Sequence, residues 1–181
     1  QYCMEGWHNP SAMYLPAVQA EQKLDAARAL LKSIIHAQDA IFTSCGTEGS
    51  NTVIFNGWQK RGTAKRHFIT SAYEHPCVYE CFRQLEQQGH RVDYVKAGKS
   101  GCISPEVVAN LVCEDTALVA IMHVNNETGA INDICAIADA VKAKNPQTIF
   151  YADGVQAFLR IPFDMMSSKV DYYSVSAHKV H

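Results

Sequence analysis

The sequence predicts an α/β protein with a mostly parallel, doubly wound sheet and helices on both faces. Short apolar segments alternate along the chain with segments whose apolar residues recur at helical spacing, as in repeated βαβ units. Residues 117–122 form a continuous apolar run, the pattern of a strand buried on both faces of a parallel sheet. Polar clusters follow the apolar segments, where ligands bind in such sheets.

The expected elements can be placed from these patterns and from turn residues. Strands are expected at 40–43, 67–71, 91–95, 117–122 and 148–152, with a last apolar and aromatic strand that ends at Ser176. Helices are expected at 16–36, from 52 to about 61, from Pro76 to the residue before Gly89, at 105–112 and at 134–144.

Composition indicates a globular protein and excludes several functions. The 181 residues carry a formal net charge of −2 with mixed charges, so neither nucleic acid nor a membrane surface is indicated as a partner. No apolar run is long enough to cross a bilayer. The seven cysteines show no C-x-x-C or zinc-like spacing. This favours reduced thiols, a cytoplasmic setting and no metal centre.

Five polar clusters follow expected strands, at residues 44–51, 70–75, 123–129, 153–156 and 176–179. They should converge, because the carboxyl ends of parallel strands lie at one edge of the sheet. The first cluster has the order strand, small polar turn, helix, which offers backbone N–H groups and a positive dipole end to a phosphate. It is neither a Walker loop nor G-x-G-x-x-G, so a nucleotide fingerprint is absent.

Two ionisable residues stand out in the last two clusters. Lys179 leaves a strand end beside His178, and a lysine that loses its proton there can attack an aldehyde through its neutral amine. Taken alone, Lys179 has the plainer interpretation of a solvated lysine. Asp153 and Gln156 close the preceding strand with a carboxylate and an amide. The plainer interpretation of Asp153 is a helix N-cap or turn residue.

Six ordered motifs extend over nearly the whole chain: Asn-Pro-Ser at 9–11, Phe-Thr-Ser-Cys-Gly-Thr-Glu at 42–48, Thr-Ser-x-x-Glu-His-Pro at 70–76, Val-Asn-Asn-Glu-Thr-Gly at 124–129, Asp-x-x-Gln at 153–156 and Ser-Ala-His-Lys at 176–179. In these motifs the sequence resembles the cysteine desulfurases of the iron–sulfur-cluster and nitrogen-fixation branch. These are fold-type-I pyridoxal-phosphate (PLP) enzymes of the class V aminotransferase family. The motifs are less specific for the substrate, because selenocysteine lyases share much of this half.

The resemblance implies roles for nine residues. Lys179 would bind PLP covalently and then shuttle protons, and His75 would stack on the pyridine ring and take part in proton transfer, so both would be catalytic. Asp153 would pair with the pyridinium nitrogen. The other cofactor contacts would be Gly46, Thr47, Ser176 and His178 around the phosphate, and Asn126 and Gln156 around the ring hydroxyl.

Plainer interpretations remain for several of these residues, and the chain departs from the family pattern in places. His75 could be a helix-start histidine, Thr47 an ordinary N-cap, and Asn126 and Gln156 loop amides. Tyr14 and Ala17 replace a histidine and a glycine of the family, which leaves the substrate side of the pocket undefined.

The family's second half carries the sulfur-accepting cysteine and the arginine for the substrate carboxylate. It also carries a phosphate contact made across the dimer. None of the seven cysteines is therefore assigned the catalytic role. We expect residues 1–181 to be the PLP-binding large domain, incomplete at both ends and without the C-terminal small domain.

The function implied by the resemblance is that of a cysteine desulfurase. It converts L-cysteine to L-alanine and passes the sulfur as a persulfide to an acceptor or scaffold protein, for iron–sulfur cluster or thio-cofactor assembly. The full-length enzyme is expected to be a cytoplasmic homodimer, and the 181 residues alone to bind PLP at most and to release no sulfide. The alternatives are a selenocysteine lyase or other class V relative, and a non-catalytic scaffold. The presence of both Lys179 and Asp153 argues against the scaffold.

Overall fold

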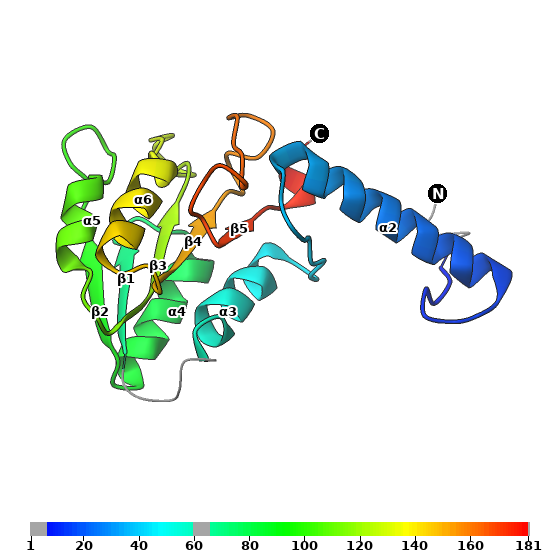
Figure 1. Ribbon diagram of the computed structural model, residues 1–181, viewed down its shortest axis with the longest axis horizontal. Coiled ribbons are helices and arrows are strands. Elements are labelled where there is room, and N and C mark those ends of the chain that lie inside the picture. The colour runs from blue at the N-terminus through cyan, green and yellow to red at the C-terminus, as the bar shows by residue number, and fades with distance from the viewer. Residues whose placement is uncertain (1–6, 60–65, 181) are drawn as a thin grey trace. The chain divides into compact units, whose positions relative to one another are not determined.

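The chain divides into two compact units, residues 1–42 and 43–181, and the computed structural model describes residues 7–59 and 66–180. The first unit contains one long helix, α2 (Leu15–Ile35), drawn in blue in Figure 1. Proline in its first turn and a left-handed residue, His36, at its C-cap bound this helix, as expected for 16–36. Among the described residues, no helix is long and apolar enough to span a bilayer.

The strand expected at 40–43 is absent, and this prediction was wrong. Residues 40–43 have no regular secondary structure, and the Ile41 and Phe42 side chains are 82% and 46% exposed. The segment is held by Arg28 of α2 instead. Its Nε donates to the Ala40 carbonyl at 3.0 Å, and its guanidinium lies over the Phe42 ring. Apolar residues alone do not make a strand where no neighbouring strand supplies hydrogen bonds.

The second unit is built on a five-stranded sheet in which every pair of neighbouring strands is parallel. In sequence order the strands are β1 (His67–Ser71), β2 (Arg91–Val95), β3 (Thr116–Met122), β4 (Ile149–Asp153) and β5 (Tyr172–Ser174). Their spatial order is β2-β1-β3-β4-β5. The direction of winding reverses between β1 and β3, which makes the gap between their carboxyl ends the topological switch point. The predicted fold class is confirmed.

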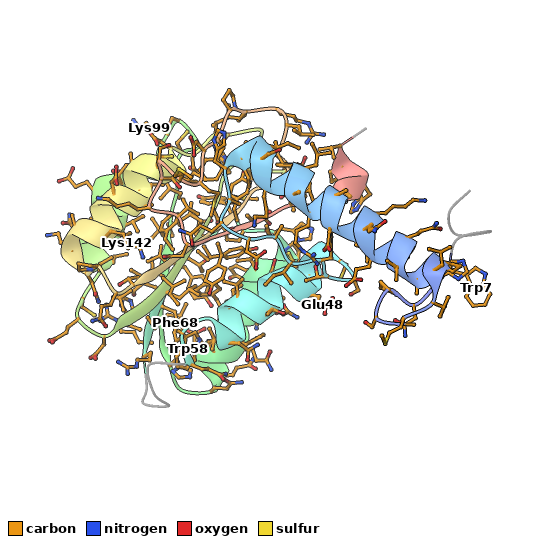
Figure 2. All side chains as sticks on the ribbon, turned by 45° about the vertical axis from the view of Figure 1, so that its right-hand side comes forward. Trp7, Glu48, Trp58, Phe68, Lys99 and Lys142 are labelled. Carbon is orange, nitrogen blue, oxygen red and sulfur yellow. The ribbon has the colours of Figure 1, made fainter. Side chains whose placement is uncertain are left out.

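Helices cover both faces of this sheet (Figure 1). One face is covered by α3 (Gly46–Asn56) and α4 (Pro76–Gln87), and the other by α5 (Pro105–Leu111) and α6 (Ile134–Lys144). Successive strand residues point to opposite faces of the sheet, so Phe68 packs in the core under α3 and α4, and Ile69 packs in the core under α5 and α6. Figure 2 shows Trp58 beside Phe68, with the ring centroids 5.2 Å apart.

Helix α3 ends earlier than the sequence suggested. It begins at Gly46, inside the turn expected at 44–51, and stops at Asn56, whereas the expected helix ran from 52 to about 61; Lys60 and Arg61 lie outside the described residues. Trp58 explains the early end, because its indole N–H donates to the carbonyl of Ile54 at 2.9 Å. That carbonyl would accept the backbone N–H of residue 58 if the helix continued.

Candidate active site

The polar clusters meet at the carboxyl edge of the sheet, as expected. A Cβ atom added to Gly46 at the start of α3 would lie 3.0 Å from Ser176 Oγ, after β5, and 4.0 Å from Val155, after β4. Glu74, after β1, accepts the backbone N–H of Met122 at the end of β3 at 3.0 Å. These contacts connect the turns after β4 and β5 with the start of α3, and the turn after β1 with the end of β3.

The start of α3 favours a negative charge. Cys45 is its N-cap residue, with an extended backbone and no side-chain cap, and Thr47 is an exposed residue of the first turn rather than the N-cap. The backbone N–H of Glu48, followed by the hydroxyl of Ser44, lowers the pKa of the Cys45 thiol. These groups stabilise a thiolate and would stabilise a phosphate in the same way. The Glu48 carboxylate, labelled in Figure 2, accepts the N–H of Ser44 and supports the turn.

Asp153 is a buried carboxylate at the end of β4, with its side chain only 6% exposed. Burial is the largest influence on its pKa and raises it. The N–H of Val155, the charge of His75 and the hydroxyl of Ser174 act in the opposite direction. The Val155 N–H donates to Asp153 Oδ1 at 3.0 Å, which is the hydrogen bond expected if Asp153 is a turn residue. A buried carboxylate is best stabilised by a cation, and this position suits a protonated ring nitrogen.

His75 caps α4 at the end of the loop that follows β1. Its Nδ1 accepts the backbone N–H of Cys77 at 3.3 Å and lies 3.0 Å from the Cys77 sulfur. Because Nδ1 accepts, the neutral ring carries its proton on Nε2. The helix-start interpretation is therefore present in the structure. The His75 ring is exposed, and its positive charge when protonated lowers the pKa of Asp153.

Lys179 and His178 lie in a short 3₁₀ turn after β5, and both side chains are exposed. Arg160 holds this turn beside the one that follows β4. Its guanidinium donates to the carbonyl of Lys179 at 2.5 Å and to the carbonyl of the half-buried Gln156 at 3.2 Å. Arg160 was missed from the sequence, because a lone arginine in a loop gives no signal of this bridge.

The loop after β3 is organised by Asn125, whereas the sequence favoured its neighbour Asn126. The Asn125 side chain accepts the N–H groups of Glu127 and Thr128 and donates to the Tyr73 carbonyl at 2.9 Å. Asn126 is exposed in the same loop. Two adjacent asparagines cannot be told apart from the sequence, and the fold turns only one of them into the loop.

The Tyr173 ring covers Gly154, the residue after Asp153, and the sequence did not reveal this contact. A Cβ added to Gly154 would be 2.0 Å from the nearest ring atom. The ring is held by a stacked Phe163, 4.4 Å away between centroids, and by a hydrogen bond of 2.9 Å between its hydroxyl and His123 Nδ1. In the sequence, Tyr173 reads only as one aromatic residue of an apolar strand.

A buried chain of hydroxyl groups connects α3 with β4 and β5. The Tyr151 hydroxyl lies 2.8 Å from Ser50 Oγ and 2.8 Å from Ser174 Oγ, and Ser50 donates to the Gly46 carbonyl at 3.0 Å. Burial is the main cause that raises the pKa of Tyr151, so its hydroxyl stays protonated. This chain fixes the start of α3 relative to the strands that carry Asp153 and Ser176.

Glu74 is buried beside the switch point and is neutral at pH 7. Its Oε1 accepts the hydroxyl of Ser71 and the N–H of Met122. Its Oε2 is buried and, among the described residues, has no hydrogen-bond partner. Burial is the main cause that raises the pKa of Glu74 from 4.5 to about 8, and the charge of Asp153 raises it further. The protonated acid remains an acceptor for Ser71 and Met122.

Replacing Glu74 with glutamine should flatten the pH dependence of stability. The folded chain holds a proton between pH 4.5 and about 8 that the unfolded chain has lost, so the free energy of unfolding falls as pH rises through this window. We expect a loss of a few kcal/mol in the wild type, since one pKa unit corresponds to about 1.4 kcal/mol, and much less in Glu74→Gln. Urea unfolding of the wild type and of Glu74→Gln at several pH values measures both dependences.

Glu127→Gln is the matched control, because Glu127 lies exposed in the loop after β3. It removes the same formal charge and should leave the slope of stability against pH as in the wild type. Equal slopes for Glu74→Gln and wild type would show that Glu74 titrates alike in the folded and unfolded chains, which would contradict a neutral, buried Glu74.

The parallel five-stranded sheet with helices on both faces is the fold of the large domain of NifS-like PLP-dependent transferases. The chain belongs to the class-V aminotransferase family, whose sequence profile matches residues 1–181. It is 38% identical over 165 residues to the cysteine desulfurase IscS of Pseudomonas fluorescens, an alignment that covers 90% of this chain and 40% of that protein. A cysteine desulfurase of Nostoc sp. is 36% identical over 182 residues, 99% of this chain and 45% of that protein.

Two solved structures share the fold over almost the whole chain. A NifS-like protein superposes with a TM-score of 0.93 at 34% identity, covering 99% of this chain and 50% of that one. SspA in complex with cysteine superposes with a TM-score of 0.92 at 31% identity, covering 99% and 52%. The chain spans about 40% of the length of the curated IscS relatives that it matches. The resemblance drawn from the motifs is confirmed at the level of the family.

Proposed function

We propose that a protein of the relatives' length that contains this chain is a PLP-dependent cysteine desulfurase, with residues 1–181 in its PLP-binding large domain. The observation that carries the proposal is the position of Asp153 and Lys179. Asp153 ends β4, and Lys179 lies in the turn after β5, the neighbouring parallel strand, whose Ser174 pairs with Asp153. The anion-favouring start of α3 lies against the same two turns, since Gly46 approaches Ser176 and Val155.

The residues present fit PLP by their chemistry. The first turn of α3, together with Ser176 and His178, offers donors for a phosphate, and Gly46 keeps the backbone free of a Cβ at the point of contact. Asp153 offers a buried carboxylate to the ring nitrogen, and Lys179 an amine to the carbonyl carbon. Asn126 and Gln156 supply amides for the ring hydroxyl. Bound there, PLP supplies an electron sink for bonds at the substrate α-carbon.

The protein's own groups have three tasks in this proposal. Lys179 Nζ takes and returns the proton of the substrate α-carbon, and His75, with its proton on Nε2, serves as a second proton carrier. Asp153 stays ionised when a cation pairs with it, in spite of its burial. Tyr173, stacked on Phe163, covers Gly154 and so fixes the backbone that follows Asp153.

The substrate proposal is L-cysteine, converted to L-alanine with the sulfur passed through a persulfide to an acceptor or scaffold protein. It is supported by relatives named cysteine desulfurase and by the structural similarity to SspA, whose structure was solved in complex with cysteine. A cytoplasmic homodimer is part of the same proposal. Cys45 is the N-cap residue of α3 and Cys77 lies 3.0 Å from His75 Nδ1, but burial raises the pKa of Cys77, and neither is proposed as the sulfur-accepting thiol.

Borohydride reduction in the presence of PLP tests the proposal directly. We expect a visible absorption band on PLP addition and, after reduction, a PLP adduct on the peptide that contains Lys179. The adduct should disappear in Lys179→Ala and persist in Lys169→Ala, which removes an exposed lysine that pairs with Asp139. Equal labelling of Lys169 and Lys179, or no adduct in either the 181-residue chain or a chain of the relatives' length, would contradict the proposal.

Product analysis separates the proposed activity from its alternatives. The chain of the relatives' length should release alanine from cysteine, and sulfide when an added dithiol reduces the persulfide, whereas the 181 residues alone should release neither. Faster turnover of selenocysteine than of cysteine would favour a selenocysteine lyase. A PLP adduct on Lys179 without turnover of either substrate would favour another class V relative, and the absence of both would favour a scaffold.

A further inference from the structure

A second cluster of reactive groups lies at the opposite edge of the sheet from the candidate active site. It consists of Cys113, His67, Asp93 and Thr116, at or near the amino ends of β1, β2 and β3. His67 pairs in register with Thr116 on one side and Arg91 on the other. A five-residue strand separates the two edges by about 16 Å. None of these residues belongs to the proposed PLP site.

The His67 imidazole connects a thiol with a carboxylate. Its Nδ1 lies 3.5 Å from the sulfur of Cys113, and its Nε2 lies 2.9 Å from Asp93 Oδ2. Arg91 donates to the same carboxylate oxygen at 2.7 Å. The ring is 2% exposed, whereas Cys113 is exposed. The exposed Cys113 thiol therefore lies within hydrogen-bonding distance of the buried His67 base.

The hydrogen bonds determine which nitrogen can act as the base. An ionised Asp93 can only accept, so the proton of the neutral His67 ring is on Nε2 and Nδ1 carries the free electron pair. Burial is the main cause that lowers the pKa of His67, with the charge of Arg91 acting in the same direction. The ring is thus neutral at pH 7, and Nδ1 is available to the thiol proton.

Thr116 can support a proton transfer between the two groups. Its hydroxyl accepts the backbone N–H of Cys113 at 2.8 Å and lies 2.8 Å from His67 Nδ1 and 3.5 Å from the Cys113 sulfur. The hydroxyl donates to the sulfur, which leaves the electron pair of Nδ1 open to the thiol proton. When Nδ1 takes that proton, the hydroxyl remains as a donor to the thiolate and stabilises its charge.

An irregularity in the sheet positions this group. The pairing of β1 with β3 shifts by one residue after His67, so that Phe68 faces Leu118 rather than the residue next to Thr116. Such bulges re-aim side chains near the end of a strand. Here the shift occurs at the pair His67 and Thr116, which carry the base and the hydroxyl.

We propose that Cys113 is a nucleophilic thiol, with His67 as its general base and Asp93 as the group that orients the base. In this proposal the Cys113 thiol is a site of covalent modification by small uncharged electrophiles such as hydroperoxides. With hydrogen peroxide, sulfur attacks one oxygen, the S–O bond forms as the O–O bond breaks, and the departing hydroxide takes the proton that Nδ1 removed from the thiol. The sulfur is oxidised to a sulfenic acid and the peroxide is reduced to water. Exposed Glu114 and Asp115 beside the thiol disfavour anionic reagents.

Site-resolved alkylation of the wild-type chain with iodoacetamide tests this proposal, with Cys135 as the internal control. Cys135 is also exposed, but burial, together with the charges of Asp133, Asp139 and Asp164, raises the pKa of its thiol. We expect Cys113 to react at least about tenfold faster at pH 7. Between pH 6 and 8 its rate should change by less than about threefold, whereas the Cys135 rate should rise about tenfold per unit.

Among the described residues, the charged groups that act on the His67 ring are Asp93, Asp115 and Arg91. We attribute a flat profile to transfer of the thiol proton to His67. If the Cys113 rate instead rises in parallel with that of Cys135, the His67 cluster is only a structural link between three strands, and the proposal is wrong.

Two variants separate the roles of the base and the carboxylate. His67→Gln can keep a side-chain N–H toward Asp93 but has no base at Nδ1, so the Cys113 rate at pH 7 should fall at least about tenfold. Asp93→Asn should give a smaller fall, and both should slow sulfenic acid formation with hydrogen peroxide in the same order. An unchanged Cys113 rate in His67→Gln would overturn the proposal.

The folding control comes from the same digests. Cys81 is buried and its thiol donates to Asn51 Oδ1 at 2.8 Å, so it should stay unreactive in every folded variant. If Cys81 becomes reactive in His67→Gln, that variant has lost its fold, and the pH profile of the wild type and the Asp93→Asn rate decide the question.

Discussion

Replacing Gly154 with alanine should lower the free energy of unfolding by about 3 kcal/mol, the upper part of the usual range for overpacking a core. The added methyl group would lie between 2.0 and 2.4 Å from three atoms of the Tyr173 side chain. The ring cannot simply turn away, because it stacks on Phe163 and its hydroxyl lies 2.9 Å from His123 Nδ1. Urea unfolding of the variant and the wild type at one pH measures the loss.

Two comparisons show whether the Tyr173 ring causes this loss. Gly49→Ala places a methyl group in α3 at an ordinary 3.6 Å from Thr43 and should leave stability unchanged or raise it by up to about 1 kcal/mol. In a Tyr173→Ala background, Gly154→Ala should cost little, because the clashing ring is gone. If Gly154→Ala costs as much without the ring as with it, backbone strain rather than Tyr173 is responsible.

The fold could be predicted because its strongest patterns are local. The continuous apolar run of β3 and the apolar face of α4, with proline at its start, each specify one element without help from the rest of the chain. The errors arose where the outcome depends on distant partners. Among the described residues no strand pairs with the apolar segment at 40–43, and α3 ends where the indole of Trp58 donates to a helix carbonyl.

The candidate site divides in the same way. Polar residues that follow strands can be recognised from the sequence, because parallel strands bring their carboxyl ends together, and Asp153 and Lys179 were found by this rule. Tyr173, Arg160 and Glu74 were not, because their roles come from burial and from contacts across the fold. Sequence spacing cannot show that a glutamate beside His75 is buried and neutral, or that a tyrosine ring covers a glycine.

Asp153→Asn should weaken PLP binding about tenfold to a hundredfold while making the cofactor-free chain more stable at pH 7. The affinity should fall because a charge-assisted hydrogen bond to the ring nitrogen, worth about 1.5–3 kcal/mol, becomes a neutral one. In the wild type, burial raises the folded-state pKa of Asp153, so the free energy of unfolding falls as pH rises past the unfolded-state pKa. At pH 7 the wild-type chain carries this cost of ionising a buried carboxylate, and the variant should be more stable because it does not. Asparagine removes that cost and can still accept the Val155 N–H.

Opposite effects on the two measurements distinguish a cofactor ligand from a turn residue. Asp133→Asn is the matched control, since Asp133 caps α6 by accepting the Ala136 N–H at 2.9 Å, and asparagine caps equally well. It should change neither PLP affinity nor stability. If Asp153→Asn behaves like Asp133→Asn, the Val155 hydrogen bond is the whole role of Asp153. If it binds PLP less tightly and unfolds at higher urea, the chain keeps a buried negative charge at the expense of its own stability, which is expected of a group held in place for a cationic partner.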